Sequence, residues 1–184
     1  NHYRYNGQQN QRIKALIAVT EILFLADENY EAKKLATTIL RLTSRKDTLA
    51  ASAFHLLGRV EFNDAHFKEA LDFFKKALAI QKEKLPENHP DIAQSLQAIG
   101  ITQSQLGQID LAFENIHTAF NINNLAFGEE HLATAETLGN LGTIYSIQGE
   151  DDRATKTIQK AIDIFKKENN EEQNIVVELY FQLG

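Results

Sequence analysis

The chain has 184 residues, of which 43% are hydrophobic and 24% are charged, and its formal net charge is −6 at pH 7. This composition is typical of a globular domain with a substantial core, and the acidic balance argues against nucleic acid as the main partner. The absence of cysteine excludes disulfides and thiolate chemistry. No apolar run approaches the roughly 20 residues that cross a membrane, and these features fit a cytoplasmic protein.

The N-terminal region is polar and shows no signal-peptide pattern between Asn1 and Gln11. Because the chain also contains no methionine, we interpret it as a segment of a larger protein. The first predicted helical hairpin covers residues 13–42, where apolar residues recur at three- and four-residue intervals. Its expected core residues are Leu16, Leu23, Tyr30, Ala32 and Leu40.

From residue 54 onward the sequence repeats itself with a spacing of 42 residues. Each copy has a large apolar residue, followed three and four places later by an aliphatic residue and a glycine. Such self-similarity is typical of repeat architectures. The four copies are Phe54-His55-Leu56-Leu57-Gly58, Leu96-Gln97-Ala98-Ile99-Gly100, Leu138-Gly139-Asn140-Leu141-Gly142 and Tyr180-Phe181-Gln182-Leu183-Gly184.

The second half of each unit repeats with the same spacing. Turn signals at 63–65, 106–108 and 148–150 separate the two halves, so each unit is predicted to be a helix-turn-helix. The equivalent positions are Ala70, Ala112 and Ala154, then Phe74, Ile116 and Ile158, then Ala77, Ala119 and Ala161.

Small residues at fixed places indicate that the two antiparallel helices of a unit approach closely. A larger side chain at Gly100 or Ala112 would push them apart. One hairpin cannot bury its apolar face alone, whereas stacked hairpins form a continuous core. We therefore predict an all-α stack of about four and a half repeats in a single domain, 1–184. The expected bounds are 13–50, 51–92, 93–134, 135–176 and a partial unit at 177–184.

These repeats resemble the tetratricopeptide repeat family, whose pattern W-x2-L-G-x2-Y, A-x3-F and P is present in degenerate form. Phe, Leu or Tyr replaces the tryptophan, and the closing proline is absent. The resemblance extends over residues 13–184 and implies a right-handed α-solenoid. The unit that matches best contains Leu138, Leu141, Gly142, Tyr145, Ala154, Ile158 and Ala161.

The spacing of 42 residues, rather than about 34, is similar to the kinesin light chain type of this family. The segments 85–93 and 127–135 also resemble its G-x-x-H-P-D-V-A signature. The extra length implies additional turns in both helices. His89 and His131 are interpreted as helix-capping residues, with Pro90 in the first helical turn.

No motif indicates an enzyme. The sequence has no phosphate-binding loop, no dinucleotide fingerprint and no nucleophile elbow. His55, His66 and His117 lack a His or Cys partner four residues away, so we predict no metal site and no cofactor. The lysine clusters at 75–76, 82–84 and 166–167 are interpreted as solvated outer faces rather than anion sites.

The resemblance implies a binding surface on the first helices of successive hairpins, which line the concave face in this family. The matching positions are rich in amides, which suit hydrogen bonding to the main chain of an extended peptide. Asn140 matches the place of a peptide-clamping asparagine. The candidates are His55, Arg59 and Phe62, then Gln94, Gln97, Ile101 and Gln105, then Glu136, Asn140 and Thr143, and Glu178, Phe181 and Gln182 in the partial unit.

We therefore expect an interaction scaffold that binds a peptide or protein segment in its concave groove. The alternative is a regulatory or sensor arm of a larger signalling protein, such as a nucleotide-switch ATPase or a secreted bacterial effector. In either case the expected partner is protein, without nucleic acid or membrane insertion. The exposed partial unit could also mediate self-association.

Overall fold

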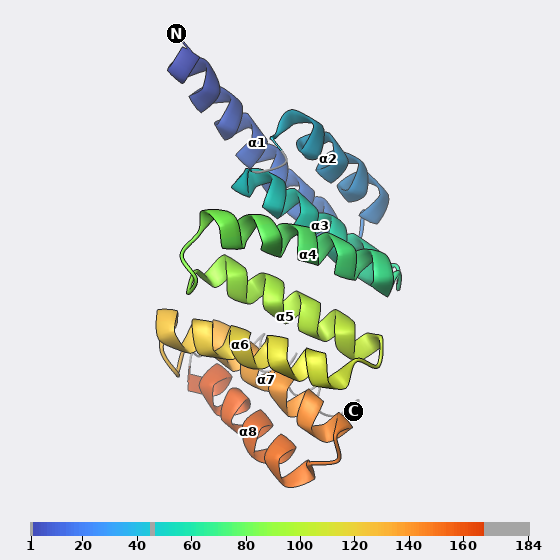
Figure 1. Ribbon diagram of the computed structural model, residues 1–184, viewed down its shortest axis with the longest axis vertical. Coiled ribbons are helices and arrows are strands. Elements are labelled where there is room, and N and C mark those ends of the chain that lie inside the picture. The colour runs from blue at the N-terminus through green and yellow to red at the C-terminus, as the bar shows by residue number, and fades with distance from the viewer. Residues whose placement is uncertain (1, 45–46, 168–184) are drawn as a thin grey trace. The chain divides into compact units, whose positions relative to one another are not determined.

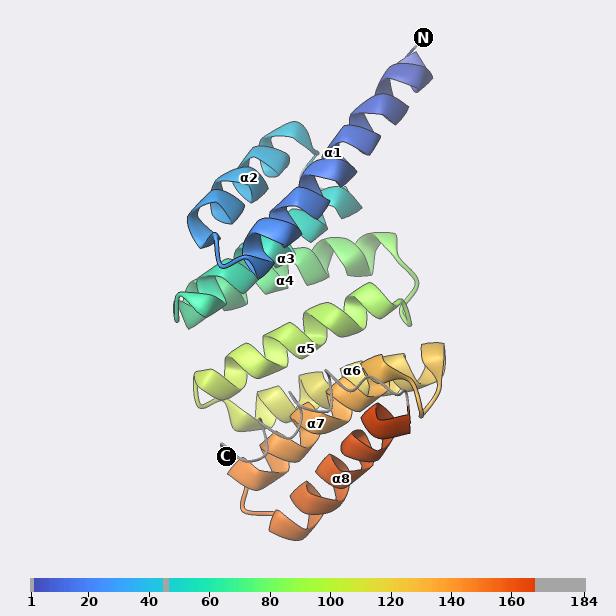
Figure 2. The ribbon, with the colours of Figure 1, turned by 180° about the vertical axis from the view of Figure 1, so that it is seen from behind.

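The computed structural model describes residues 2–44 and 47–167, which form eight α-helices and no β-strand (Figure 1). The chain divides into two compact units, Asn1–Glu87 and Asn88–Gly184. Within each unit, consecutive helices pack as antiparallel neighbours, as Figure 2 shows from behind. Unit 1 contains α1 (His2–Leu25), α2 (Asn29–Leu42), α3 (Thr48–Asn63) and α4 (Phe67–Lys84), and unit 2 contains α5 (Pro90–Gln105), α6 (Ile109–Phe127), α7 (Leu132–Ile147) and α8 (Asp151–Lys167).

This helical content confirms the predicted all-α repeat fold. The helices from α3 to α8 have between 16 and 19 residues. None of the described helices combines the length and the hydropathy that crossing a membrane requires.

The core of unit 1 is formed mainly by aliphatic and small side chains of α1, α2, α3 and α4. Ile13 and Ile39 pack against Ala53. Because several of the fully buried positions are alanines, the helix axes can approach closely. The remaining clusters contain Ala36, Leu56 and Leu57, and Ala50, Ala51, Ala77 and Ile80.

The first hairpin differs from the prediction in two respects. The helix α1 begins at His2 rather than near residue 13, because polar residues without apolar periodicity can still continue a helix. Tyr30, predicted to be in the core, is 77% exposed. It lies in the first turn of α2, where its ring faces the exposed Lys34. Ala32 is fully buried as predicted, and Leu16, Leu23 and Leu40 are half-buried.

The core of unit 2 is built largely from the residues that recur in the sequence. One cluster joins α6 and α7, and a second joins α7 and α8. Burial of these positions explains why they repeat, since each must fit against its neighbouring helix. The clusters contain Ala112, Ile116, Leu141 and Ile144, and Ala135, Leu138, Ala161 and Ile164.

Three repeated glycines lie where the two helices of a hairpin touch. A Cβ atom at Gly100 would lie 2.5 Å from Cγ1 of Ile116 and 3.0 Å from the carbonyl oxygen of Ala112. Real Cβ atoms do not come so close to another heavy atom, so the predicted close approach of the helices is confirmed. The contacting pairs are Gly58 with Phe74, Gly100 with Ile116, and Gly142 with Ile158.

The turns after α3, α5 and α7 each contain one residue with positive φ, at equivalent places 42 residues apart. In unit 2 these residues are Gly107 (φ 73°) and Gly149 (φ 76°), whereas unit 1 has Ala65 (φ 58°). Glycine adopts this backbone conformation without steric cost, but alanine does not. The predicted turns are confirmed, and the turn in unit 1 has the less favourable residue.

Candidate functional site

The helices α5 and α7 of unit 2 are neighbours, and each exposes one polar stripe. The stripe positions are three or four residues apart, so they share a face of their helix, while intervening residues such as Leu96 and Leu138 are buried. Since α7 repeats α5 with a spacing of 42 residues, equivalent positions face the same side. We call this surface the amide face: Gln94, Gln97, Ile101 and Gln105 of α5, with Glu136, Asn140 and Thr143 of α7.

The amide face brings together those predicted site residues that lie in unit 2. Its outermost side chains, Gln94, Gln105, Glu136 and Thr143, are exposed. The others, Gln97, Ile101 and Asn140, are half-buried. A ligand would therefore reach all of these side chains without opening the core.

Amides on this face have unused hydrogen-bonding capacity, because they bond to no other described residue. Amides inside unit 2 are different. Asn115 Nδ2 donates to Gln103 Oε1 at 2.8 Å, and Asn123 Nδ2 donates to Thr137 Oγ1 at 2.9 Å. In unit 2, therefore, these internal amides have hydrogen-bond partners within the protein, whereas the amides of the amide face remain available to a ligand.

Glu136 is the charged side chain of the amide face. Desolvation raises the pKa of its carboxyl group above the usual value, and the nearby His131 acts in the opposite direction. Glu136 forms no ion pair or hydrogen bond with another described residue. The face therefore presents one incompletely solvated carboxyl group among neutral amides.

In unit 1, His55 occupies the place equivalent to Gln97, but it is only 9% exposed. Its ring centroid lies 5.1 Å from that of Phe74. Burial, assisted by the positive charge of Arg59, lowers the pKa of His55 to about 4. His55 is therefore a neutral residue packed against α4, and it is not presented at the surface as the sequence suggested.

Arg59 and Phe62 are also engaged within unit 1. The Arg59 Cζ atom lies 4.1 Å from the ring centroid of Phe24 in α1, which is a cation–π contact. Burial lowers the pKa of Arg59, while the charge of Glu21 acts in the opposite direction. The Phe62 ring packs edge-on against Phe67, with centroids 5.2 Å apart. Both predicted side chains are half-buried and have intramolecular partners.

His89 and His131 cap the N-termini of α5 and α7. Each Nδ1 atom accepts a hydrogen bond from a backbone N–H two residues later, that of Asp91 or Ala133, at 3.1 Å. Pro90 stands in the first turn of α5. The predicted capping role is confirmed, and it assigns these imidazoles to helix initiation.

One group of described side chains, Glu61, Asp64 and His66, has potential metal-ligand atoms within 4.8 Å of one another. However, the buried Glu61 carboxylate is already paired with Lys33 Nζ at 2.6 Å and His66 Nδ1 at 3.0 Å. Burial opposes ionisation of Glu61, but these two partners outweigh it and lower its pKa. A cation would have to displace Lys33, so we interpret this cluster as a structural ion pair between α2 and α3. This ion pair could not be predicted from the sequence, because nothing in the repeat pattern relates residue 33 to residue 61.

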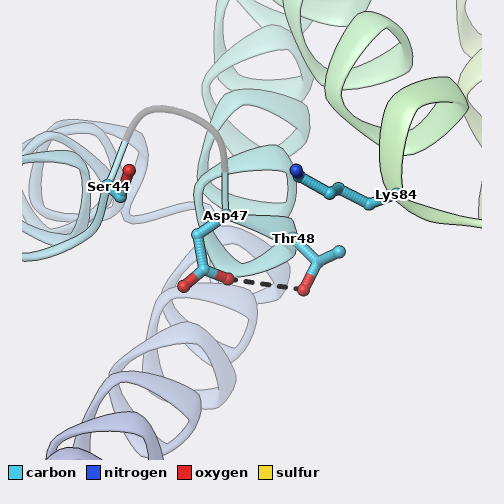
Figure 3. A pocket seen from close by; sticks show the side chains of 4 residues that line it. All are labelled: Ser44, Asp47, Thr48 and Lys84. Atoms are coloured by element: carbon cyan, nitrogen blue, oxygen red, sulfur yellow. Dashed lines mark hydrogen bonds between the residues drawn. The ribbon is translucent and has the colours of Figure 1, made fainter.

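An open pocket in unit 1 is lined by Ser44, Asp47, Thr48 and Lys84 (Figure 3). Asp47 is the N-cap of α3 and accepts hydrogen bonds from the Leu49 backbone N–H at 3.0 Å and the Thr48 hydroxyl at 3.4 Å. Lys84 pairs with Glu83 at 3.0 Å. Asp47, Thr48 and Lys84 have structural partners, so the pocket is a weaker candidate site than the amide face. The predicted residues Glu178, Phe181 and Gln182 lie outside the described residues.

Comparison with solved structures shows the same fold in proteins of low sequence identity. BtubC (BKLC) from P. vanneervenii has a TM-score of 0.79 at 18% identity, with 92% of this chain and 68% of that chain covered. The apo form of RapI has a TM-score of 0.79 at 19% identity, and the match covers 94% of this chain and 62% of RapI. A putative kinesin light chain from Podosopora anserina with nearly identical TPR-like repeats has a TM-score of 0.66 at 17% identity, with 92% of each chain covered.

A family model described as tetratricopeptide repeat matches residues 49–116 and 91–167. These overlapping matches include the regular units. They begin after the first hairpin, which does not follow the 42-residue spacing of the later units. Together with the kinesin light chain-like neighbours, they confirm the relationship that the sequence indicated. The chain belongs to the tetratricopeptide repeat family.

Proposed function

We propose that this protein is an interaction scaffold whose amide face binds an extended segment of a partner protein. The supporting observation is the set of surface amides without a bonding partner among the described residues, on two adjacent, repeat-equivalent helices. Tetratricopeptide repeat proteins are generally non-catalytic scaffolds, which agrees with this role. A cytoplasmic setting is part of the same proposal.

Amides suit an extended peptide because each offers two N–H donors and one carbonyl acceptor. Peptide main chain presents the complementary groups at every residue, whatever its side chains. Stripe positions along α5 or α7 are about one helical turn, roughly 5.4 Å, apart, whereas an extended chain advances about 3.3 Å per residue. The stripe would therefore contact about every second residue of the ligand.

The proposal concerns unit 2 specifically. The corresponding side chains of unit 1 are buried or stacked within the unit, as His55 and Arg59 illustrate. Partner affinity should therefore depend on Gln97 and Asn140 and be insensitive to His55.

The test is selection from a displayed library of unstructured decapeptides, followed by measurement of Kd for the enriched sequences. The double variant Gln97→Ala/Asn140→Ala should weaken binding by tenfold or more, since each lost hydrogen bond contributes about 1 kcal/mol. The matched control is Asn124→Ala, which removes an exposed amide from α6 of the same unit and should change Kd less than twofold. Failure to enrich any peptide, or equal effects of the two variants, would refute the proposal.

A further inference from the structure

The amide face lies in a part of the chain that contains no positively charged lysine or arginine. Residues 88–150, which form α5, α6 and α7, contain seven Asp and Glu residues and neither Lys nor Arg. The basic residues of the described part of unit 2 all lie on α8. They are Arg153, Lys156, Lys160, Lys166 and Lys167.

Several of these basic residues already have partners away from the amide face. Arg153 pairs with Glu150 at 2.6 Å and lies over the ring of Tyr145. Lys160 pairs with Glu129 in the link between α6 and α7. Such pairs neutralise acidic groups outside the face, so the carboxyl group on the face itself is left without an internal counter-charge.

That carboxyl group belongs to Glu136, one helical turn before Asn140 on α7. It has no ion-pair partner among the described residues, and its environment is desolvated enough to disfavour the charged form. A cation brought to this exposed position would pair with a carboxyl group that has no competing partner among the described residues. An acidic group brought there would meet like charge without any nearby lysine or arginine on α5, α6 or α7.

We infer that the amide face selects partner segments that carry a lysine or arginine side chain, which pairs with Glu136 while Gln97 and Asn140 hold the adjacent main chain. This inference rests on the proposed function and adds the chemical class of the ligand. The amides hold any extended segment, and Glu136 discriminates by charge. Opposite charges across an interface contribute mainly to such discrimination.

The test uses three labelled, end-blocked octapeptides that alternate serine with lysine, glutamine or glutamate, with binding measured by fluorescence anisotropy at 50 mM salt. The lysine peptide should bind at least fivefold more tightly than the glutamine peptide, and the glutamate peptide should bind least. Glu136→Gln should abolish most of the lysine preference, whereas Glu114→Gln, which removes an exposed carboxylate from α6, should leave it within twofold.

Charge reversal provides a gain-of-binding measurement that loss of folding cannot imitate. Glu136→Lys should bind the glutamate peptide more tightly than the lysine peptide. If all three peptides bind the original protein equally and Gln97→Ala/Asn140→Ala weakens all three, the scaffold function stands and the charge selection is wrong. If Glu136→Gln and Glu114→Gln reduce the lysine preference equally, Glu136 is not the selective residue. If none of the three peptides binds, the proposed function itself fails.

Discussion

Units 1 and 2 use the same helical hairpins, but they carry opposite charge and treat equivalent surface positions differently. Residues 1–87 contain 14 Lys and Arg against 11 Asp and Glu, whereas residues 88–184 contain 5 against 14. In unit 1, His55 is buried and Arg59 stacks on Phe24. In unit 2, the equivalent Gln97 and Ile101 remain half-exposed. Positions that repeat therefore build the hairpins, and positions that vary distinguish the units.

The largest expected effect concerns the helix contact that both units share. Gly100→Val should destabilise the protein by about 3 kcal/mol, because its Cβ would overlap Ile116 and approach the Ala112 carbonyl. The free energy of unfolding by urea measures this loss. The control is Gly139→Ala on α7, where a Cβ meets nothing within 4 Å, so stability should rise by about 0.5–1 kcal/mol. Equal effects of the two changes would contradict the close-contact explanation.

The second-largest expected effect is a pH dependence of the folding stability, and it comes from His55 in unit 1. The pKa of His55 falls from 6.5 to about 4 on folding, so the unfolded chain binds the proton first as the pH decreases. The stabilising contribution of neutral His55 is present above pH 6.5 and is lost progressively as the pH falls toward 4. Between pH 7 and pH 5, this loss amounts to about 2 kcal/mol.

His55→Gln, which copies the residue of unit 2, should flatten this pH dependence. The measurement is the free energy of unfolding by urea at pH 7 and at pH 5, for the original protein and for the variant. An unchanged slope in the variant would show that His55 is not responsible.

The smallest effect concerns the turn that differs between the units. Ala65→Gly should stabilise the protein by about 1 kcal/mol, because it relieves the positive φ of 58° at this position. Gly149→Ala, at the equivalent turn of unit 2, should destabilise it by a similar amount. Thermal unfolding of both variants is the measurement, and destabilisation by Ala65→Gly would contradict the assigned strain.

Much of the fold could be predicted from the sequence, because burial imposes periodicity. Gly100 and Ala112 recur every 42 residues since two helices meet there, and the turn at Gly107 recurs because the backbone needs a positive φ. The capping role of His131 was also predictable, but for a different reason: it depends on a backbone N–H only two residues away. The exposed position of Tyr30 was not predictable. It lies in the first turn of α2, and the apolar spacing there fits a residue that faces the core as well as one that faces solvent.

The sequence by itself determined the helical units, their spacing and their contacts within each hairpin, because these depend on local periodicity and on residues that recur. Only the tertiary structure decided which of the variable positions are available to a partner. His55 and Gln97 are equivalent in the repeat, yet the ring of Phe74 packs against one while the other keeps an unbonded amide on the amide face. Exposure depends on neighbours that are distant in sequence, and periodicity carries no information about them.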